Sequence, residues 1–76
     1  MYNQYETFYC TTEKMAKTTR AFRNGLLLID EVAQTFTAEI DRLLQQGNEY
    51  QRSEQYRNKC MIRMYNALAH LLQETT

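Results

Sequence analysis

Apolar residues recur every seven positions along this chain, and a second set interleaves with them at spacings of three and four. The first set is Phe8, Met15, Phe22, Ile29, Phe36, Leu43, Tyr50, Arg57, Met64 and Leu71, in which only Arg57 is charged. The second set is Leu26, Ala33, Ile40, Gly47, Glu54, Met61 and Leu68. These spacings put one residue per turn on a single helical stripe. The pattern therefore predicts helices that pack on other helices, and it specifies no chemistry.

Glycine marks two candidate breaks between the helices. The chain has no proline, and Gly25 and Gly47 each adjoin an asparagine. Both residue types tolerate the left-handed backbone that often ends a helix. Gly47 is the stronger break because the stripe is polar around it, whereas helix could continue through Gly25 at a cost of about 1 kcal/mol.

The two breaks divide the chain into segments with recognisable start signals. Thr11 or Thr12 is a candidate N-cap for the first helix, and Ser53 is a candidate N-cap for the third. At 76 residues the chain has the length of one small domain. We therefore predict a single helical domain over residues 1–76, with helices over approximately residues 12–24, 26–46 and 50–74.

Charge predicts how the second and third segments pack. The segment between the two breaks is acidic, and the segments on either side of it are basic. A fold back at Gly47 would bring Asp41 opposite Arg57 and Glu39 near Lys59. A straight parallel dimer would instead stack each Arg57 on its counterpart, which is unfavourable. We therefore predict an antiparallel hairpin of the second and third helices, with the first helix extending it or folding across it.

The third helix has a wider apolar surface than one neighbour can cover. Ile62, Tyr65, Ala69 and Leu72 form a second stripe beside the first one. A helix that is apolar on two sides needs a neighbour on each side. A chain this short buries only about 60% of its unfolded surface, so many small domains gain stability by oligomerising. The predicted fold class is all-α, an antiparallel helical hairpin with an additional N-terminal helix, forming a helical bundle as a homodimer.

The opening segment is rich in aromatic residues. Tyrosine is enriched at recognition surfaces because it buries a large area at little entropic cost. This segment is either a further helical turn packed on the bundle or a recognition arm. Together with the outer side chains of the third helix, it supplies the predicted partner-binding residues: Tyr2, Tyr5, Phe8, Tyr9, Ile62, Tyr65 and Leu72.

A basic ridge is the best case for binding nucleic acid. Arg52, Lys59, Arg63 and His70 have spacings of seven, four and seven, which would place them on one side of a helix that could follow a phosphate backbone. Two observations disfavour this function. The nine basic residues are balanced by nine acidic ones, and no helix-turn-helix signature or aromatic stacking platform is present. A solvated outer face is the preferred interpretation.

The sequence contains no pattern that predicts catalysis, a cofactor or a metal site. It has a single serine and a single histidine, and His70 with Glu74 is typical of a surface ion pair. Cys10 and Cys60 have neither metal-ligand nor redox spacing. We expect a non-enzymatic cytoplasmic protein with free thiols, no signal peptide and no membrane span.

These observations favour an interaction protein. Our hypothesis is a module that occupies a surface of a larger protein, as small regulators, inhibitors and co-chaperones do, and it rests on analogy at the level of the fold. The alternative is a dimeric nucleic-acid-associated regulator that uses the basic segments. A bundle that only assembles with itself is a third possibility.

Overall fold

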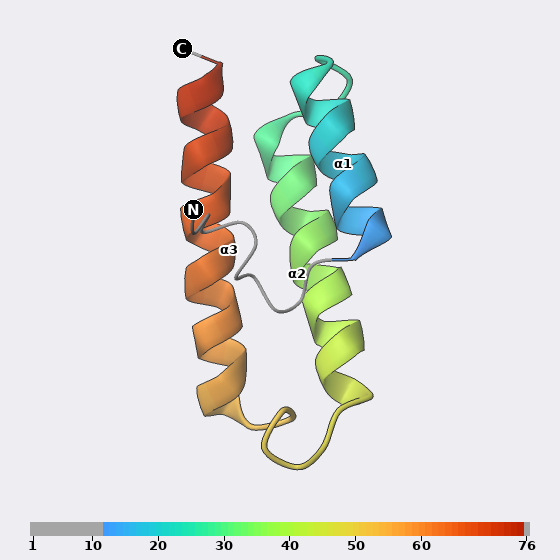
Figure 1. Ribbon diagram of the computed structural model, residues 1–76, viewed down its shortest axis with the longest axis vertical. Coiled ribbons are helices and arrows are strands. Elements are labelled where there is room, and N and C mark those ends of the chain that lie inside the picture. The colour runs from blue at the N-terminus through green and yellow to red at the C-terminus, as the bar shows by residue number, and fades with distance from the viewer. Residues whose placement is uncertain (1–11, 76) are drawn as a thin grey trace, which may run out of the picture.

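The helices of the chain fold back on one another in sequence order (Figure 1). The computed structural model describes residues 12–75, which form α1 (Glu13–Arg23), α2 (Ile29–Gln45) and α3 (Glu54–Glu74). No strand occurs in this range, so the all-α fold class is confirmed for it. The predicted hairpin is formed by α2 and α3, and α1 folds back along α2 instead of extending it.

Two helices begin at the capping residues that the sequence predicts. The side-chain oxygen of Thr12 accepts a hydrogen bond of 3.2 Å from the N–H of Met15 at the start of α1. The hydroxyl of Ser53 accepts one of 3.2 Å from the N–H of Tyr56 at the start of α3. Each bond satisfies a backbone donor that has no partner inside the helix.

The predicted break at Gly25, between the helices expected over residues 12–24 and 26–46, is present in the structure, and the alternative in which helix continues through it is wrong. Gly25 has a φ of +78°, which glycine adopts at no steric cost because it has no Cβ. The N–H of Leu26 donates to the carbonyl of Ala21 at 2.9 Å, and the N–H of Gly25 donates to that of Phe22 at 3.0 Å. This pair of bonds is a Schellman motif, which ends α1. As a result α2 begins at Ile29 and not near residue 26.

The second break is a turn that is longer than predicted. Asn48 and Gln51 hydrogen-bond reciprocally, each side chain accepting from the other residue's N–H at 2.9 Å. Short polar side chains that bond to nearby backbone favour turns over helix. The third helix therefore begins at Glu54, after the predicted start near residue 50.

The core lies between the three helices and consists mostly of the heptad residues. It is a cluster of buried side chains from all three helices: Met15, Val32, Phe36, Ile40, Leu44, Cys60, Met61, Met64, Leu68 and Leu71. Two apolar members of the heptad pattern are exceptions, since Leu26 is 75% exposed and Tyr50 is 50% exposed. The Schellman motif takes the chain out of the helical register just before Leu26.

One of the two predicted ion pairs in the hairpin is confirmed. The Nε of Arg57 donates to Oδ1 of Asp41 at 2.8 Å, which joins α3 to α2. The predicted approach of Glu39 to Lys59 is wrong. Glu39 accepts hydrogen bonds from Arg42 on its own helix and from Thr12 at the start of α1.

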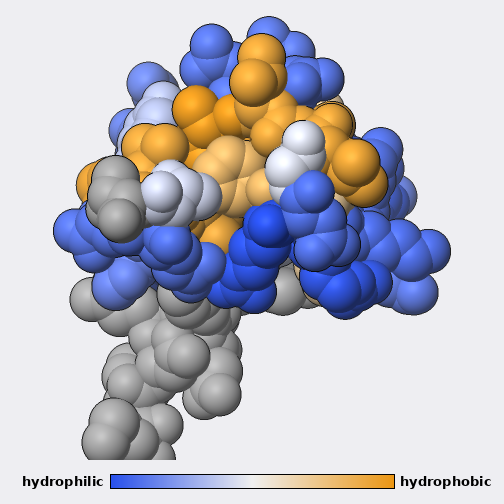
Figure 2. Space-filling view, turned by 90° about the horizontal axis from the view of Figure 1, so that it is seen from above, coloured by the Kyte–Doolittle hydropathy of each residue, from blue (hydrophilic) through white to orange (hydrophobic). Residues whose placement is uncertain are grey.

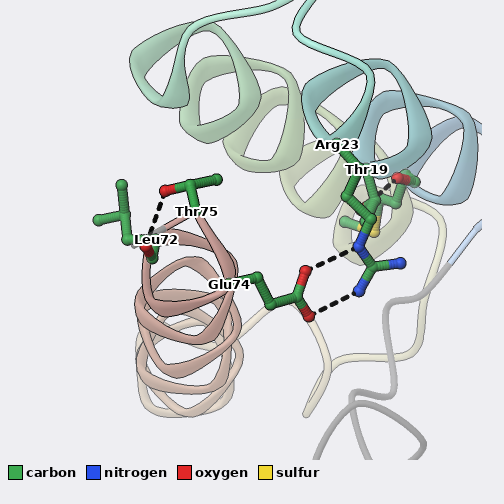
Figure 3. Close-up of polar contacts among 6 residues, drawn as sticks. Thr19, Arg23, Leu72, Glu74 and Thr75 are labelled. Atoms are coloured by element: carbon green, nitrogen blue, oxygen red, sulfur yellow. Dashed lines mark hydrogen bonds and ion pairs between the residues drawn. The ribbon is translucent and has the colours of Figure 1, made fainter.

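A second ion pair joins the ends of α1 and α3. The guanidinium of Arg23 donates to both carboxylate oxygens of Glu74, at 2.9 and 3.0 Å (Figure 3). This hydrogen bond holds the pKa of Glu74 below its ordinary value. Glu74 therefore pairs mainly with Arg23, and the nearby charge of His70, which the sequence suggested as its partner, also lowers the Glu74 pKa.

Candidate protein-interaction surface

The outer side of α3 exposes large apolar side chains. Ile62 is 61% exposed, Tyr65 is 62% exposed and Leu72 is 45% exposed, and Ala69 between them is also exposed. We call these four residues the α3 stripe. Single apolar residues on a surface are ordinary, but several in a row on one helix are typical of a binding site.

Helical geometry explains why the α3 stripe is left uncovered. The residues of α3 that pack in the core include Met64 and Leu71, which are 1% and 0% exposed. With 3.6 residues per turn, the stripe is centred roughly a third of a turn away from these core residues. The neighbouring α2 covers the core side of α3. Within residues 12–75 no further helix packs on the stripe.

The loop between α1 and α2 adds two more exposed apolar side chains. Leu26 is 75% exposed and Leu28 is 72% exposed, whereas Leu27 between them packs on the core. We call Leu26 and Leu28 the loop leucines. This loop lies at the same end of the molecule as the C-terminal end of α3. Figure 2 looks onto this end and shows hydrophobic side chains gathered there, with hydrophilic ones around them.

Sequence reasoning identified the α3 stripe but not the loop leucines. The heptad pattern assigned Leu26 to the helical seam and did not single out Leu28. A signal was present, because both residues follow the Asn24-Gly25 pair directly. Taking that pair as a firm helix end would have placed the leucines in a loop.

The basic ridge is not a continuous helical feature. Arg52 precedes α3, and its guanidinium donates to the backbone carbonyl of Gly47 in the turn. Lys59 donates to the hydroxyl of Tyr50 at 3.2 Å and lies 6.0 Å from the centre of that ring. Arg63 and His70 lie on α3 beyond it. The prediction that all four share one side of a helix is therefore wrong for Arg52.

The most buried polar side chain lies beside the start of α1. Glu39 is 5% exposed and accepts hydrogen bonds of 2.8 Å from both Arg42 Nε and Thr12 Oγ1. The bond from Arg42, followed by that from Thr12, lowers the pKa of Glu39 to about 2. A carboxylate held ionised in this way is a poor general base near neutral pH. Its contacts join α1 to α2.

Two further observations concern residues of the kinds that bind metals or react as thiols. Within residues 12–75, no three His, Cys, Asp or Glu side chains lie close enough to form a metal site. The Cys60 side chain is 1% exposed in the core. The aromatic residues of the opening segment and Cys10 lie outside the described residues.

Comparisons with known proteins give no relative from which a function could be carried over. The chain matches no protein-family model, no curated protein and no solved structure. Among the helices described here, none has the length and hydrophobicity needed to cross a membrane.

Proposed function

We propose that this chain is a non-enzymatic interaction module that occupies a surface of a larger protein. The observation that carries the proposal is the exposure of the α3 stripe, at 61% for Ile62 and 62% for Tyr65, on a helix whose other side is buried in the core. An α-helix that presents apolar side chains at helical spacing can lie in a hydrophobic groove of another protein. The proposed binding residues are those of the stripe, together with the aromatic residues of the opening segment.

The loop leucines extend this proposed surface. They lie at the end of the molecule where α3 reaches Leu72, so a partner that covers this end of the stripe could cover them as well. Aromatic and aliphatic anchors at the centre of an interface usually contribute most of its binding energy. We expect Tyr65 and Leu72 to be such anchors.

The proposal also fits the distribution of charge. Acidic and basic residues are equal in number, and two cations of the basic ridge make contacts within the chain. A nucleic-acid interface would need several cations on one face that are able to contact phosphates. A protein surface recognised through apolar contacts needs no such excess.

The test is capture of bound macromolecules from a native extract by the immobilised chain, with two matched variants. One variant carries Ile62→Gln and Leu72→Gln on the α3 stripe, and the control carries Lys59→Gln and Arg63→Gln on the basic ridge. We expect wild type and control to retain the same protein at about 0.5 M salt, where the Debye length is only about 4 Å. The stripe variant should lose that protein while its circular dichroism spectrum stays helical.

The opposite pattern would contradict the proposal. If the captured material is nucleic acid, is released as salt rises and is lost in the Lys59→Gln, Arg63→Gln variant, the chain is a nucleic-acid-associated regulator. If both variants capture the same protein as wild type, the α3 stripe is not the binding surface.

A further inference from the structure

We infer that a second copy of this chain covers the α3 stripe when no other protein does, with the two α3 helices packed antiparallel. The inference does not depend on the proposed function, because self-association is a property of the purified chain. It gives the predicted dimer a specific interface and a specific register. Three properties of the stripe support it.

The first property is that the stripe is complementary to itself. Ile62 and Leu72 lie five residues on either side of Ala67, and Tyr65 and Ala69 lie two residues on either side of it. A two-fold axis at the level of Ala67 would therefore place Ile62 opposite Leu72 of the partner subunit. It would also place the large ring of Tyr65 opposite the small side chain of Ala69 of the partner subunit. Alternation of large and small side chains lets facing helices interdigitate.

The second property is that this register brings no like charges together. The stripe has no charged member, and residues 55 and 58, which continue it towards the N-terminal end of α3, are glutamine and asparagine. In the antiparallel register, Lys59 would lie level with Thr75 of the partner subunit. The cation of Arg63 lies roughly 140° around the helix from the centre of the stripe, by the rotation of about 100° per residue. A second copy can therefore approach the stripe without the repulsion that opposes many homodimers.

The third property is length. The positions of α3 that face one another in this register run from residue 60 to residue 74, which corresponds to roughly 22 Å of helix at 1.5 Å per residue. Two α3 helices packed over that length, each backed by its own α2, form a four-helix core of a common type. Symmetric dimers with one self-complementary patch are the commonest oligomers of soluble proteins.

The loop leucines do not point to one binding partner, whereas the α3 stripe fits a second copy of the chain. Their immediate neighbours include Asp30 and Glu31 on one side and Arg23 on the other. Acidic residues so close to the loop oppose insertion into an anionic membrane surface. No symmetric pairing of Leu26 and Leu28 follows from their positions, so the second copy is assigned to the α3 stripe.

Sedimentation equilibrium on the purified chain tests the inference. We expect wild type to reach twice its monomer mass of 9.1 kDa at micromolar concentration. Ile62→Lys and Leu72→Glu should each weaken the dimer by at least about 100-fold, because each change occurs twice in a symmetric interface. Helical circular dichroism should be unchanged, because both side chains are on the surface. Lys59→Glu, away from the stripe, is the control and should stay dimeric.

The double variant Ile62→Lys, Leu72→Glu tests the antiparallel register. The two positions are ten residues apart on one helix, too far for a bond within the chain, but they face each other across the proposed two-fold axis. The double variant should therefore dimerise more tightly than either single variant, by about fivefold or more. The inference is overturned by a wild-type monomer at about 100 µM, by single variants that dimerise like wild type, or by a double variant no tighter than the singles.

Discussion

At the scale of single residues, Glu39 is a charged side chain that is buried where few polar atoms are available as hydrogen-bond partners. Within residues 12–75 it is the one buried residue among Asp, Glu, Lys, Arg and His, at 5% exposure. Burial of a carboxylate is costly unless hydrogen bonds replace those from water. Arg42 and Thr12 supply these bonds, and the first turn of α1 lies beside the carboxylate. Helix N-termini attract negative charge, so the same contact stabilises the start of α1.

The low pKa of Glu39 predicts how stability depends on pH. Its pKa is about 2 in the folded chain against an ordinary value of 4.5, so the folded state holds the ionised form more strongly than the unfolded state does. Its contribution to stability is therefore complete above pH 4.5 and is lost as the pH falls towards 2. Urea unfolding across this range should show wild type losing stability more steeply than Glu39→Gln.

The control for this experiment is Glu49→Gln in the exposed turn between α2 and α3. This change also removes one carboxylate, but it breaks no hydrogen bond to another helix. We expect its pH dependence to follow wild type. Identical slopes for wild type and Glu39→Gln would show that Glu39 is not linked to folding.

At the scale of the helices, core packing holds α2 against α3, and one ion pair between them shows their register. Asp41 and Arg57 meet at 2.8 Å, and their side chains are each 44% exposed. Salt bridges this exposed contribute about 0.2–1 kcal/mol. The pair therefore stabilises the hairpin only slightly, and its main use is as a marker of register.

A charge-reversal cycle tests that register. Asp41→Lys places two cations together and should lower the free energy of unfolding by about 1 kcal/mol. Adding Arg57→Glu reverses the pair and should restore part of the loss, measured by urea unfolding. Arg57→Glu by itself should destabilise, because it leaves two carboxylates together. Losses that simply add in the double variant would mean that α2 and α3 pair in another register.

The helices and their pairing could be predicted because they depend on local patterns. Heptad spacing requires helix, and opposite charges on either side of the Gly47 turn can meet in only one hairpin. The surface around Gly25 could not be predicted in the same way. A repeat of seven can continue in the sequence where the helix itself has ended. The pattern therefore placed Leu26 on the helical stripe, although the Schellman motif ends α1 just before it.

Contacts between α1 and α2 were also beyond the sequence patterns. The bond from Thr12 to Glu39 spans 27 residues and depends on the angle at which α1 folds back. Charge order alone therefore predicted a partner for Glu39 on the wrong helix, namely Lys59 on α3. The α3 stripe was predicted correctly as a set of positions, because a helix that is apolar on two sides is visible in the sequence whatever covers it.

At the scale of the whole molecule, the arrangement of three helices explains the uncovered surface. In the described chain α1 packs mainly on α2 and reaches the end of α3 through Arg23 and Glu74. The core is therefore enclosed, but α3 keeps α2 as its principal helical neighbour (Figure 1). A small domain can be well packed and still leave one flank to another chain. Both the proposed function and the proposed dimer depend on that flank.

Whether α3 is buried on one side and uncovered on the other can be measured directly by the rate at which its thiols react with a maleimide in dilute solution. A chain carrying Ile62→Cys and Cys10→Ser has one introduced thiol at the α3 stripe and the native thiol of Cys60 in the core. At nanomolar concentration, position 62 should react about as fast as a free thiol, and Cys60 at least about 100-fold more slowly. Raising the concentration should protect position 62. Equal rates at the two positions, or protection of position 62 even at nanomolar concentration, would contradict the claim that α3 buries one side and leaves the other uncovered.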